Sequence, residues 1–183
     1  MNTPLAERMR PKLLKDYFGQ EHLVGTKGSL TQMIENGIFP SLIFWGPPGT
    51  GKTTLASLLA NEKDRPFYQL SAINSGVKEI RDIISKAEHS GDLFSGKSPI
   101  LFIDEIHRFS KSQQDSLLNA VEKGTITLIG ATTENPSFEV INALLSRCQV
   151  YILNPLEKKD LEKILISALQ TDTQLKDKSI KIK

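Results

Sequence analysis

Eight consecutive residues in the first third of the chain have the spacing of a phosphate-binding loop. Residues 46–53 read GPPGTGKT, the pattern G-x-x-x-x-G-K-T, between one apolar run that ends at Trp45 and another that begins at Leu55. Glycines in such a loop let successive backbone N–H groups point at an anion, and the N-terminus of the following helix adds a favourable dipole. Lys52 is then expected to contact the β and γ phosphates, and Thr53 to supply a hydroxyl ligand for Mg²⁺. A chance glycine-rich turn is disfavoured, because the motif stands in the strand-then-helix setting that it requires.

A pair of acidic residues about fifty positions later adds the chemistry of hydrolysis. Asp104 and Glu105 end an apolar run that begins at Ile100. After a phosphate-binding loop, Asp104 is predicted to hold Mg²⁺ through its waters, and Glu105 to orient the attacking water or to accept its proton. The alternative for Glu105 is a solvated acid at the end of a strand. A transferase would not need the second acid, because its acceptor substrate replaces water, so the pair favours hydrolysis over phosphorylation of a small molecule.

The order of apolar runs predicts the elements that place these groups. Short apolar runs alternate with helical patterns, which is typical of a parallel sheet wrapped by helices. We expect helices after Lys52, over residues 77–88 and over residues 110–124, the last with Ser110 and Gln113 at the spacing of a capping box. The five predicted strands are residues 41–45, 67–70, 99–104, 125–131 and 149–153. The predicted fold class is therefore α/β, with a five-stranded parallel sheet.

Two further segments flank this predicted core. Residues 1–40 are interpreted as an N-terminal arm that leads into the first strand, and residues 41–154 as the core itself. After Pro155 the pattern changes to an amphipathic helix with no strand after it. Residues 155–183 are therefore expected to begin a second, helical domain. The apolar positions of its helix are Leu161, Ile164, Leu165, Ala168 and Leu169.

Composition limits the remaining classes of protein. A chain of 183 residues with 39% hydrophobic residues is long enough to bury a core. The net charge of +2, from 23 basic and 21 acidic residues, gives no global argument for nucleic acid. The single cysteine, Cys148, excludes an internal disulfide and a multi-cysteine metal site, and we expect it to be a small buried residue that opens the fifth strand. No apolar run approaches the roughly 18 residues that would span a bilayer, so a cytoplasmic protein without a membrane partner is expected.

Several stretches carry a resemblance to a known family. They are RMRPKLLKDYFGQEHLVG (8–25), GPPGTGKTT (46–54), LFIDEIHRFSKSQQDSLL (101–118) and TITLIGATTENPSFEVINALLSRC (125–148). Together they resemble the AAA+ ATPases of the clamp-loader type. SAINSGVKEIR (71–81) and GATTENPSFE (130–139) are similar in particular to the family of replication-associated recombination protein A, also called MgsA, and of the Werner helicase-interacting protein. The resemblance implies a P-loop NTPase fold of three layers followed by the start of a helical lid, and ATP hydrolysis by an oligomer at stalled or damaged replication forks.

The resemblance implies two sets of contacts with ATP. One set lies in the loop, and the other lies in the N-terminal arm, near the adenine base. Alternatively, the arm merely packs on the core, and the sequence does not separate these two roles. The contacts in the loop are Gly46, Pro47, Pro48, Gly49, Thr50, Gly51, Lys52, Thr53 and Thr54. The contacts in the arm are Arg10, Pro11, Tyr17, Phe18 and Gly19.

The resemblance also implies residues that act on the γ-phosphate. Thr133 takes the sensor-1 position at the end of the fourth strand, with Thr132 as the second choice. The alternative is that both hydroxyls cap the following helix, for which Asn135 before Pro136 is already a good signal. Arg147 is the candidate arginine finger, which reaches the ATP of a neighbouring subunit and stabilises charge on the transferred phosphoryl group. Its alternative is a cation near the end of a helix, where it favours the helix dipole.

Contacts with DNA and with other proteins rest on the resemblance alone. Lys78 and Arg81 are candidates for contacts with DNA phosphates, although charges on the exposed face of a helix are usually only solvated. Residues 107–109 are interpreted either as a solvated loop or as a contact with the neighbouring subunit. The expected partners are single-stranded or forked DNA, further copies of the chain and, as a candidate, a single-stranded-DNA-binding protein. ATP and Mg²⁺ are the expected ligands, and the expected location is the nucleoid in the cytoplasm.

Three classes of function compete at this point. The leading hypothesis is an ATP hydrolase that works with DNA. A nucleotide-binding, clamp-loader-like subunit with little hydrolysis of its own is the alternative, and the complete motifs argue against it because degenerate subunits typically lose the loop lysine or the acid pair. A kinase of a small metabolite is disfavoured by the acid pair and by the segment LLSRC (144–148). A sensor-2 arginine, which the lid normally supplies, is not recognised up to Lys183.

Overall fold

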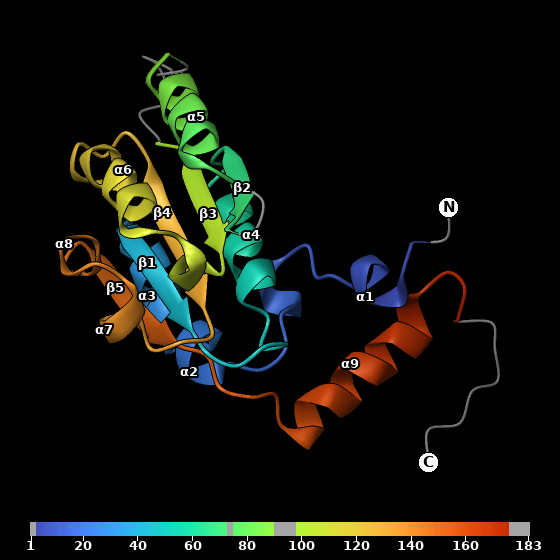
Figure 1. The fold of residues 1–183 in the computed structure, drawn as a ribbon. Helices are drawn as coiled ribbons and strands as arrows, with labels where there is room; N and C mark the ends of the chain where they lie inside the picture. Colours follow the sequence, from blue (N-terminus) through green and yellow to red (C-terminus); the bar gives the residue numbers. More distant parts are fainter. Residues whose placement is uncertain (1–2, 73–74, 90–97, 176–183) are drawn as a thin grey trace.

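The computed structural model describes residues 3–72, 75–89 and 98–175. At its centre lies a sheet of five parallel strands in the order β2-β3-β4-β1-β5 (Figure 1). This sheet confirms the predicted fold class, and the predicted bounds differ from the observed ones by at most two residues. The strands are β1 (Ser41–Trp45), β2 (Phe67–Ser71), β3 (Ile100–Asp104), β4 (Thr127–Thr132) and β5 (Cys148–Ile152).

Helices cover both faces of the sheet and make the molecule a three-layer sandwich. Neighbouring side chains of β1 point to opposite layers: Leu42 and Phe44 pack with the first group of helices, and Ile43 packs with the second. The first group is α2 (Glu21–Val24), α3 (Ser29–Glu35) and α4 (Lys52–Glu62), and the second is α5 (Val77–His89), α6 (Lys111–Glu122) and α8 (Asn142–Leu145). Residues Ile100 to Ile103 of β3 are fully buried, as a strand covered on both faces requires.

Local sequence signals fix the ends of several helices. Ser110 and Gln113 form the predicted capping box of α6, and Gly124 follows this helix with a positive φ of 67°. The side chain of Asn135 accepts a hydrogen bond from the backbone N–H of Ser137 at 3.0 Å and so caps the short helix α7 (Pro136–Glu139). Cys148 opens β5 as predicted and is half-buried, and burial raises the pKa of its thiol to about 12.

The parallel sheet gathers the predicted chemical groups at one edge. Because all strands run in the same direction, the segments that follow them meet at their carboxyl ends, where ligands bind in open α/β sheets. The loop of residues 46–51 follows β1, Glu105 follows β3, and Thr133 follows β4. These three strands are neighbours in the sheet, in the order β3-β4-β1.

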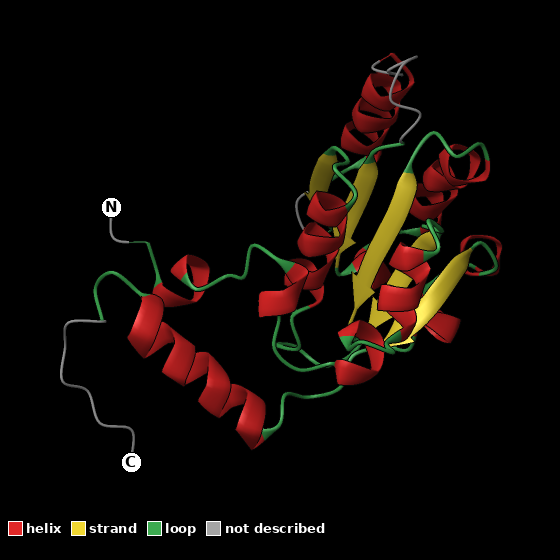
Figure 2. Ribbon diagram, turned by 180° about the vertical axis from the view of Figure 1, so that it is seen from behind, coloured by secondary structure: helices red, strands yellow, loops and turns green. Residues whose placement is uncertain are grey.

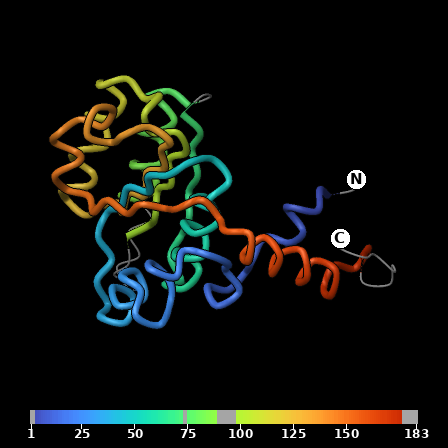
Figure 3. Tube along the Cα trace, turned by 90° about the horizontal axis from the view of Figure 1, so that it is seen from below, coloured from blue at the N-terminus to red at the C-terminus, as the bar shows by residue number. Residues whose placement is uncertain are grey.

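The two segments outside the sandwich lie beside each other. Helix α1 (Leu5–Arg8) and helix α9 (Lys158–Thr171) come from opposite ends of the chain, yet they meet away from the sheet (Figures 2 and 3). Helix α9 confirms the predicted helix, but its apolar face is only partly covered within the described residues: Ala168 is buried, whereas Leu161 and Leu165 are each 49% exposed. Residues 176–183 of the expected helical domain lie outside the described residues. No helix in the described part of the chain is both long and apolar enough to cross a membrane.

Candidate functional site

The loop between β1 and α4 has the conformation of a phosphate cradle. Gly51 precedes α4 with φ of 90°, a value that side chains rarely adopt, and a Cβ atom there would lie 2.5 Å from the hydroxyl of Tyr17. A Cβ atom on Gly46 would lie 2.3 Å from the carbonyl oxygen of Leu153. The neighbours of the loop therefore exclude side chains at both positions. The backbone N–H groups at the start of α4 have no partner within the helix and are available to an anion.

Lys52 is folded over this loop. Its Nζ atom donates hydrogen bonds to the carbonyl oxygens of Gly46 at 2.7 Å and Pro47 at 2.9 Å. Burial lowers the pKa of Lys52, and the negative charges of Glu105 and Asp104 act in the opposite direction. Lys52 begins α4 after β1 and the acid pair ends β3, so both lie at the carboxyl end of the sheet. Both hydrogen-bond partners of Lys52 are neutral carbonyls, which phosphate oxygens can replace.

The acid pair lies at the end of β3 and is not freely solvated. Burial and the neighbouring charge of Glu105 raise the pKa of Asp104. Glu105 has a left-handed backbone with φ of 57°, a strained conformation for a residue with a side chain. One of its carboxylate oxygens, Oε2, lies 3.3 Å from Nε2 of His107 and 3.6 Å from Nε of Arg108. This pairing argues against the interpretation of Glu105 as a merely solvated acid.

The two threonines at the end of β4 differ in their surroundings. Thr132 is fully buried, and its hydroxyl contacts Nδ1 of His107 at 3.1 Å and the backbone N–H of Glu134 at 3.0 Å. Thr133 is half-buried and is the first residue after the strand. Because Asn135 caps α7, the hydroxyl of Thr132 does not perform that task. Thr132 is already engaged inside the protein, so Thr133 remains our candidate for the sensor position.

Arg147 does not belong to the site of its own chain. It precedes β5, whose first residue, Cys148, pairs with Ser41, the first residue of β1, so it lies at the amino end of the sheet. The phosphate-binding loop follows the carboxyl end of the same strand. The Arg147 guanidinium forms an ion pair with Glu122 at 2.5 Å and donates to the carbonyl oxygen of Ala143 in α8, also at 2.5 Å. This second contact is the one that a cation at the end of a helix makes.

A cleft of about 810 Å³ opens beside the loop, between the N-terminal arm and α9. Four of the five arm residues predicted near the base line it, and the fifth, Gly19, does not: it packs against Leu156, to which a Cβ atom at position 19 would approach within 2.6 Å. The predicted residues that line the cleft are Arg10, Pro11, Tyr17, Phe18, Gly49, Thr50, Gly51 and Thr54. Those that sequence reasoning missed are Arg8, Met9, Lys12, Lys15, Asp16, Leu156, Ile164, Ser167, Thr171, Asp172 and Thr173. Ile164 belongs to the predicted apolar face of α9, but nothing in the sequence indicates what that face covers.

Three polar contacts hold the walls of the cleft. Tyr17 donates a hydrogen bond to the carbonyl oxygen of Thr50 at 3.0 Å, and burial raises the pKa of Tyr17, so it stays a neutral donor. The side-chain amide of Gln20 is paired with the backbone of Asn154: its Nε2 donates to the carbonyl at 2.6 Å, and its Oε1 accepts from the N–H at 2.9 Å. These contacts attach the arm to the loop and to the chain that leads into α9.

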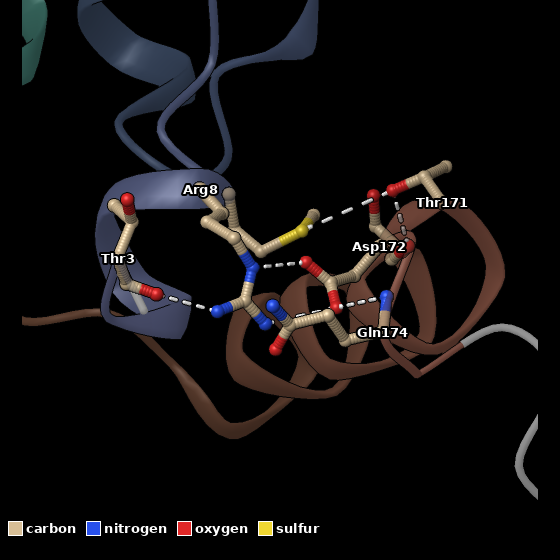
Figure 4. Close-up of polar contacts among 7 residues, drawn as sticks. Thr3, Arg8, Thr171, Asp172 and Gln174 are labelled. Atoms are coloured by element: carbon tan, nitrogen blue, oxygen red, sulfur yellow. Dashed lines mark hydrogen bonds and ion pairs between the residues drawn. The ribbon is translucent and has the colours of Figure 1, made fainter. Parts of the chain in front are cut away.

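The third contact lies at the far end of the cleft. The guanidinium of Arg8 donates from Nε to one oxygen of Asp172 at 2.7 Å and from Nη2 to the other at 2.9 Å (Figure 4). Asp172 also accepts from the backbone N–H of Gln174 at 3.0 Å, and its carboxylate is almost fully buried, at 2% exposed. The hydrogen bonds from Arg8 lower the pKa of Asp172. The first helix of the chain and the end of α9 are thereby joined.

The candidates for contacts with DNA lie on the exposed side of α5. Lys78 and Arg81 are both exposed, and they alternate with the acids Glu79 and Asp82. Such a mixed surface has no strong charge of one sign. The structure therefore leaves the two basic residues as candidates, without a further observation in their favour.

Comparison with protein-family models matches residues 42–156 to the family described as "ATPase family associated with various cellular activities (AAA)". Replication-associated recombination protein A of Escherichia coli strain K12 is 52% identical over 171 residues, which cover 93% of this chain and 38% of that protein. ATPase WRNIP1 of Dictyostelium discoideum is 48% identical over 178 residues, which cover 97% of this chain and 20% of that protein. These similarities confirm the resemblance that the motifs indicate. The chain spans little more than a third of the length of the bacterial relative.

A solved structure with the same arrangement is the RuvB Holliday junction branch migration motor of Thermotoga maritima. It matches with a TM-score of 0.69 and 31% sequence identity, over 89% of this chain and 54% of that one. The structural similarity thus extends beyond the sheet to most of the described residues. The match to this structure therefore agrees with the match to the AAA family model.

Proposed function

Because the chain belongs to the AAA family of ATPases, we propose that it binds ATP in the cleft between the N-terminal arm and α9 and hydrolyses it there. In this proposal the chain acts as one subunit of an oligomer that works with DNA at stalled or damaged replication forks. The observation that carries the proposal is the placement of Lys52, Asp104 and Glu105 at the carboxyl end of the sheet, beside the glycine loop. These are the groups that bind phosphates, hold a metal ion and activate water.

Binding begins with an exchange of partners at Lys52. Its ammonium leaves the carbonyl oxygens of Gly46 and Pro47 for the phosphate oxygens, which carry full charge and form stronger hydrogen bonds. The base then lies in the cleft against Tyr17 and Phe18. Thr53 and Asp104 offer a hydroxyl and a carboxylate oxygen, the donor types that suit Mg²⁺, so both residues fit the ion. Bound Mg²⁺ supplies neutralisation of the phosphate charge.

Hydrolysis depends on Glu105. Its carboxylate orients a water molecule toward the γ-phosphorus and accepts the proton that the water loses as the new P–O bond forms. The bond to the bridging oxygen breaks, and ADP leaves with that oxygen. Thr133, at the end of β4, is the residue that we assign to contact with the γ-phosphate and the attacking water.

A second subunit completes the site. Arg147 lies at the opposite end of the sheet from its own loop, and 39% of its side chain is exposed, so it is available to a neighbour. A permanently charged guanidinium stabilises the charge that develops on the transferred phosphoryl group. We therefore assign Arg147 as an arginine finger that acts on the ATP of the adjacent subunit.

The DNA part of the proposal rests on the relatives. Their names refer to replication-associated recombination and to branch migration at Holliday junctions. We extend this to single-stranded or forked DNA as a partner of this protein, with Lys78 and Arg81 as contacts. A nucleoid location in the cytoplasm and a single-stranded-DNA-binding protein as a further partner belong to the same proposal.

The test is ATP turnover of the complete gene product, with and without forked or single-stranded DNA. We expect hydrolysis that DNA changes by at least a fewfold, with the Lys52→Ala variant as the inactive control. ATP binding without turnover under either condition would favour the passive clamp-loader-like subunit. Transfer of phosphate to an acceptor other than water would favour a kinase.

A further inference from the structure

A chain of polar contacts joins the end of β4 to the acid that follows β3. His107, in the short 3-10 helix η2 (Ile106–Arg108), lies between the two. Its Nδ1 atom is 3.1 Å from the hydroxyl oxygen of Thr132, and its Nε2 atom is 3.3 Å from Oε2 of Glu105. The ring is largely enclosed, since only 12% of its side chain is exposed. Both ring nitrogens are therefore used, and one of them touches the residue that activates water in the proposed reaction.

The contacts decide which nitrogen carries hydrogen. Nε2 of His107 and Oε2 of Glu105 lie at ion-pair distance, and because an ionised carboxylate can only accept, a hydrogen on Nε2 favours this contact. In a neutral ring Nδ1 is then an acceptor for the hydroxyl of Thr132, which also has the carbonyl oxygen of Glu134 within reach as an acceptor, at 3.1 Å. The same hydroxyl oxygen accepts from the backbone N–H of Glu134 at 3.0 Å. Polar contacts thus connect the backbone beyond β4 with Glu105 through Thr132 and His107.

The backbone at Glu105 explains why such a support is needed. Its left-handed φ of 57° is held by the turn into η2, in which Arg108 N–H donates to the Glu105 carbonyl oxygen at 2.8 Å. The side chain of Glu105 is 27% exposed, so it is only partly fixed by packing. Arg108 also reaches the carboxylate, but at 3.6 Å and with 56% of its side chain exposed. The enclosed contact with His107 is the better fixed of the two.

We propose that His107 is a positioning residue, which orients the Glu105 carboxylate and ties its position to the end of β4 through Thr132. The proposal rests on the proposed ATP hydrolysis, because it names a residue that serves the same site. Thr133, the candidate for contact with the γ-phosphate, follows Thr132 directly. Movement of Thr133 on contact with the γ-phosphate is therefore transmitted to Glu105 within the same subunit, through the contacts of His107 with Thr132 and with Glu105.

The test compares variants of His107 in the complete gene product, with ATP affinity, turnover and melting temperature measured for each. His107→Ala should lower kcat about 10- to 100-fold, the scale of a hydrogen bond to a charged group, and leave ATP affinity and melting temperature nearly unchanged. His107→Gln, whose amide can still donate near the position of Nε2, should recover most of the lost kcat. His22→Ala is the matched control, since His22 contacts the carbonyl oxygen of Ile152 and does not line the cleft.

A double variant tests the connection to β4. Thr132→Val should lower kcat, Thr132→Ser should not, and Thr132→Val combined with His107→Ala should be no slower than His107→Ala alone, because both act through one chain of contacts. Independent, multiplying effects of the two substitutions would contradict the proposal. So would an unchanged or raised kcat in His107→Ala. A wild-type protein that does not hydrolyse ATP at all would instead contradict the proposed function, so the two failures are distinguishable.

Discussion

The phosphate side of the cleft and its base side are built in different ways. On the phosphate side, the loop, the acids and the end of β4 continue directly from three neighbouring strands whose side chains are almost all fully buried. On the base side, the walls are the N-terminal arm and α9, which meet away from the sheet (Figure 2). Side-chain contacts that join them include Gln20–Asn154 and Arg8–Asp172, which link residues 134 and 164 positions apart in the chain.

This difference indicates a division of tasks. Groups that do chemistry must be held within fractions of an ångström, and the buried strands hold them. In the proposed complex the base would contribute affinity, for which a wall that can reposition suffices. Substitutions on the phosphate side should therefore abolish binding or chemistry, whereas substitutions on the base side should change affinity by modest factors.

The largest effect is expected at Lys52. It supplies positive charge in a cradle otherwise made of neutral backbone dipoles, so Lys52→Ala should abolish measurable ATP binding and leave the fold intact. Calorimetric titration with ATP measures the first effect, and circular dichroism checks the second. Tight ATP binding by a correctly folded Lys52→Ala variant would contradict the assignment of this loop as the phosphate-binding site.

A smaller but still large effect is expected at Arg147. If it acts on the neighbouring subunit, Arg147→Ala should leave ATP affinity unchanged and lower hydrolysis in the assembly by about a thousandfold. Glu122→Ala is the matched control: it removes the ion pair of Arg147 but keeps the guanidinium, so hydrolysis should stay within a fewfold.

Mixed assemblies show whether Arg147 acts between subunits. When the Arg147→Ala protein is mixed with the Lys52→Ala protein, part of the lost activity should return. Some interfaces in the mixed assemblies then pair an intact loop from one subunit with an intact arginine from the other. No recovery, although mixed assemblies form, would show that Arg147 is only a cation at the end of α8.

The smallest effect is expected at Arg8, on the base side. Arg8→Ala leaves the buried carboxylate of Asp172 without its main partner, so α9 and the arm should separate more easily. We expect the KM for ATP to rise about three- to tenfold, the scale of a partly exposed charge-assisted pair, with kcat within twofold. Steady-state kinetics measures both values, and Lys163→Ala, which alters an exposed lysine of α9, is the control variant. If Arg8→Ala lowered kcat as much as Arg147→Ala, the result would contradict the claim that the base side affects affinity rather than chemistry.

The sequence predicts the phosphate side far better than the base side, for a physical reason. The loop, the acid pair and the helix caps are short patterns whose chemistry is local, so Gly51, Ser110 and Asn135 already indicate the conformations that the structure has. The contact of Arg8 with Asp172 joins the two ends of the described chain, and no local pattern announces it. The left-handed backbone of Glu105 is equally hidden, because it follows from the turn into η2.

The same reason explains what the sequence leaves open on α9 and at Gly19. The helical period correctly predicts α9, but which residues it buries depends on the arm opposite, so Leu161 and Leu165 are half-exposed. For Gly19, the resemblance of the arm to the family implies a place near the base. In the structure Gly19 contacts Leu156, which lines the cleft, but does not line the cleft itself.

Hydrolysis of ATP by Glu105 is the central claim, and one pair of measurements on one variant tests it most directly. Glu105→Gln keeps the size of the side chain and removes the group that accepts a proton. The variant should bind ATP in the presence of Mg²⁺ with an affinity within about threefold of the wild type, and turn it over at least about a hundredfold more slowly, the usual scale for loss of a general base. Turnover within a fewfold of the wild type, at unchanged affinity, would contradict the account, because another residue would then activate the water.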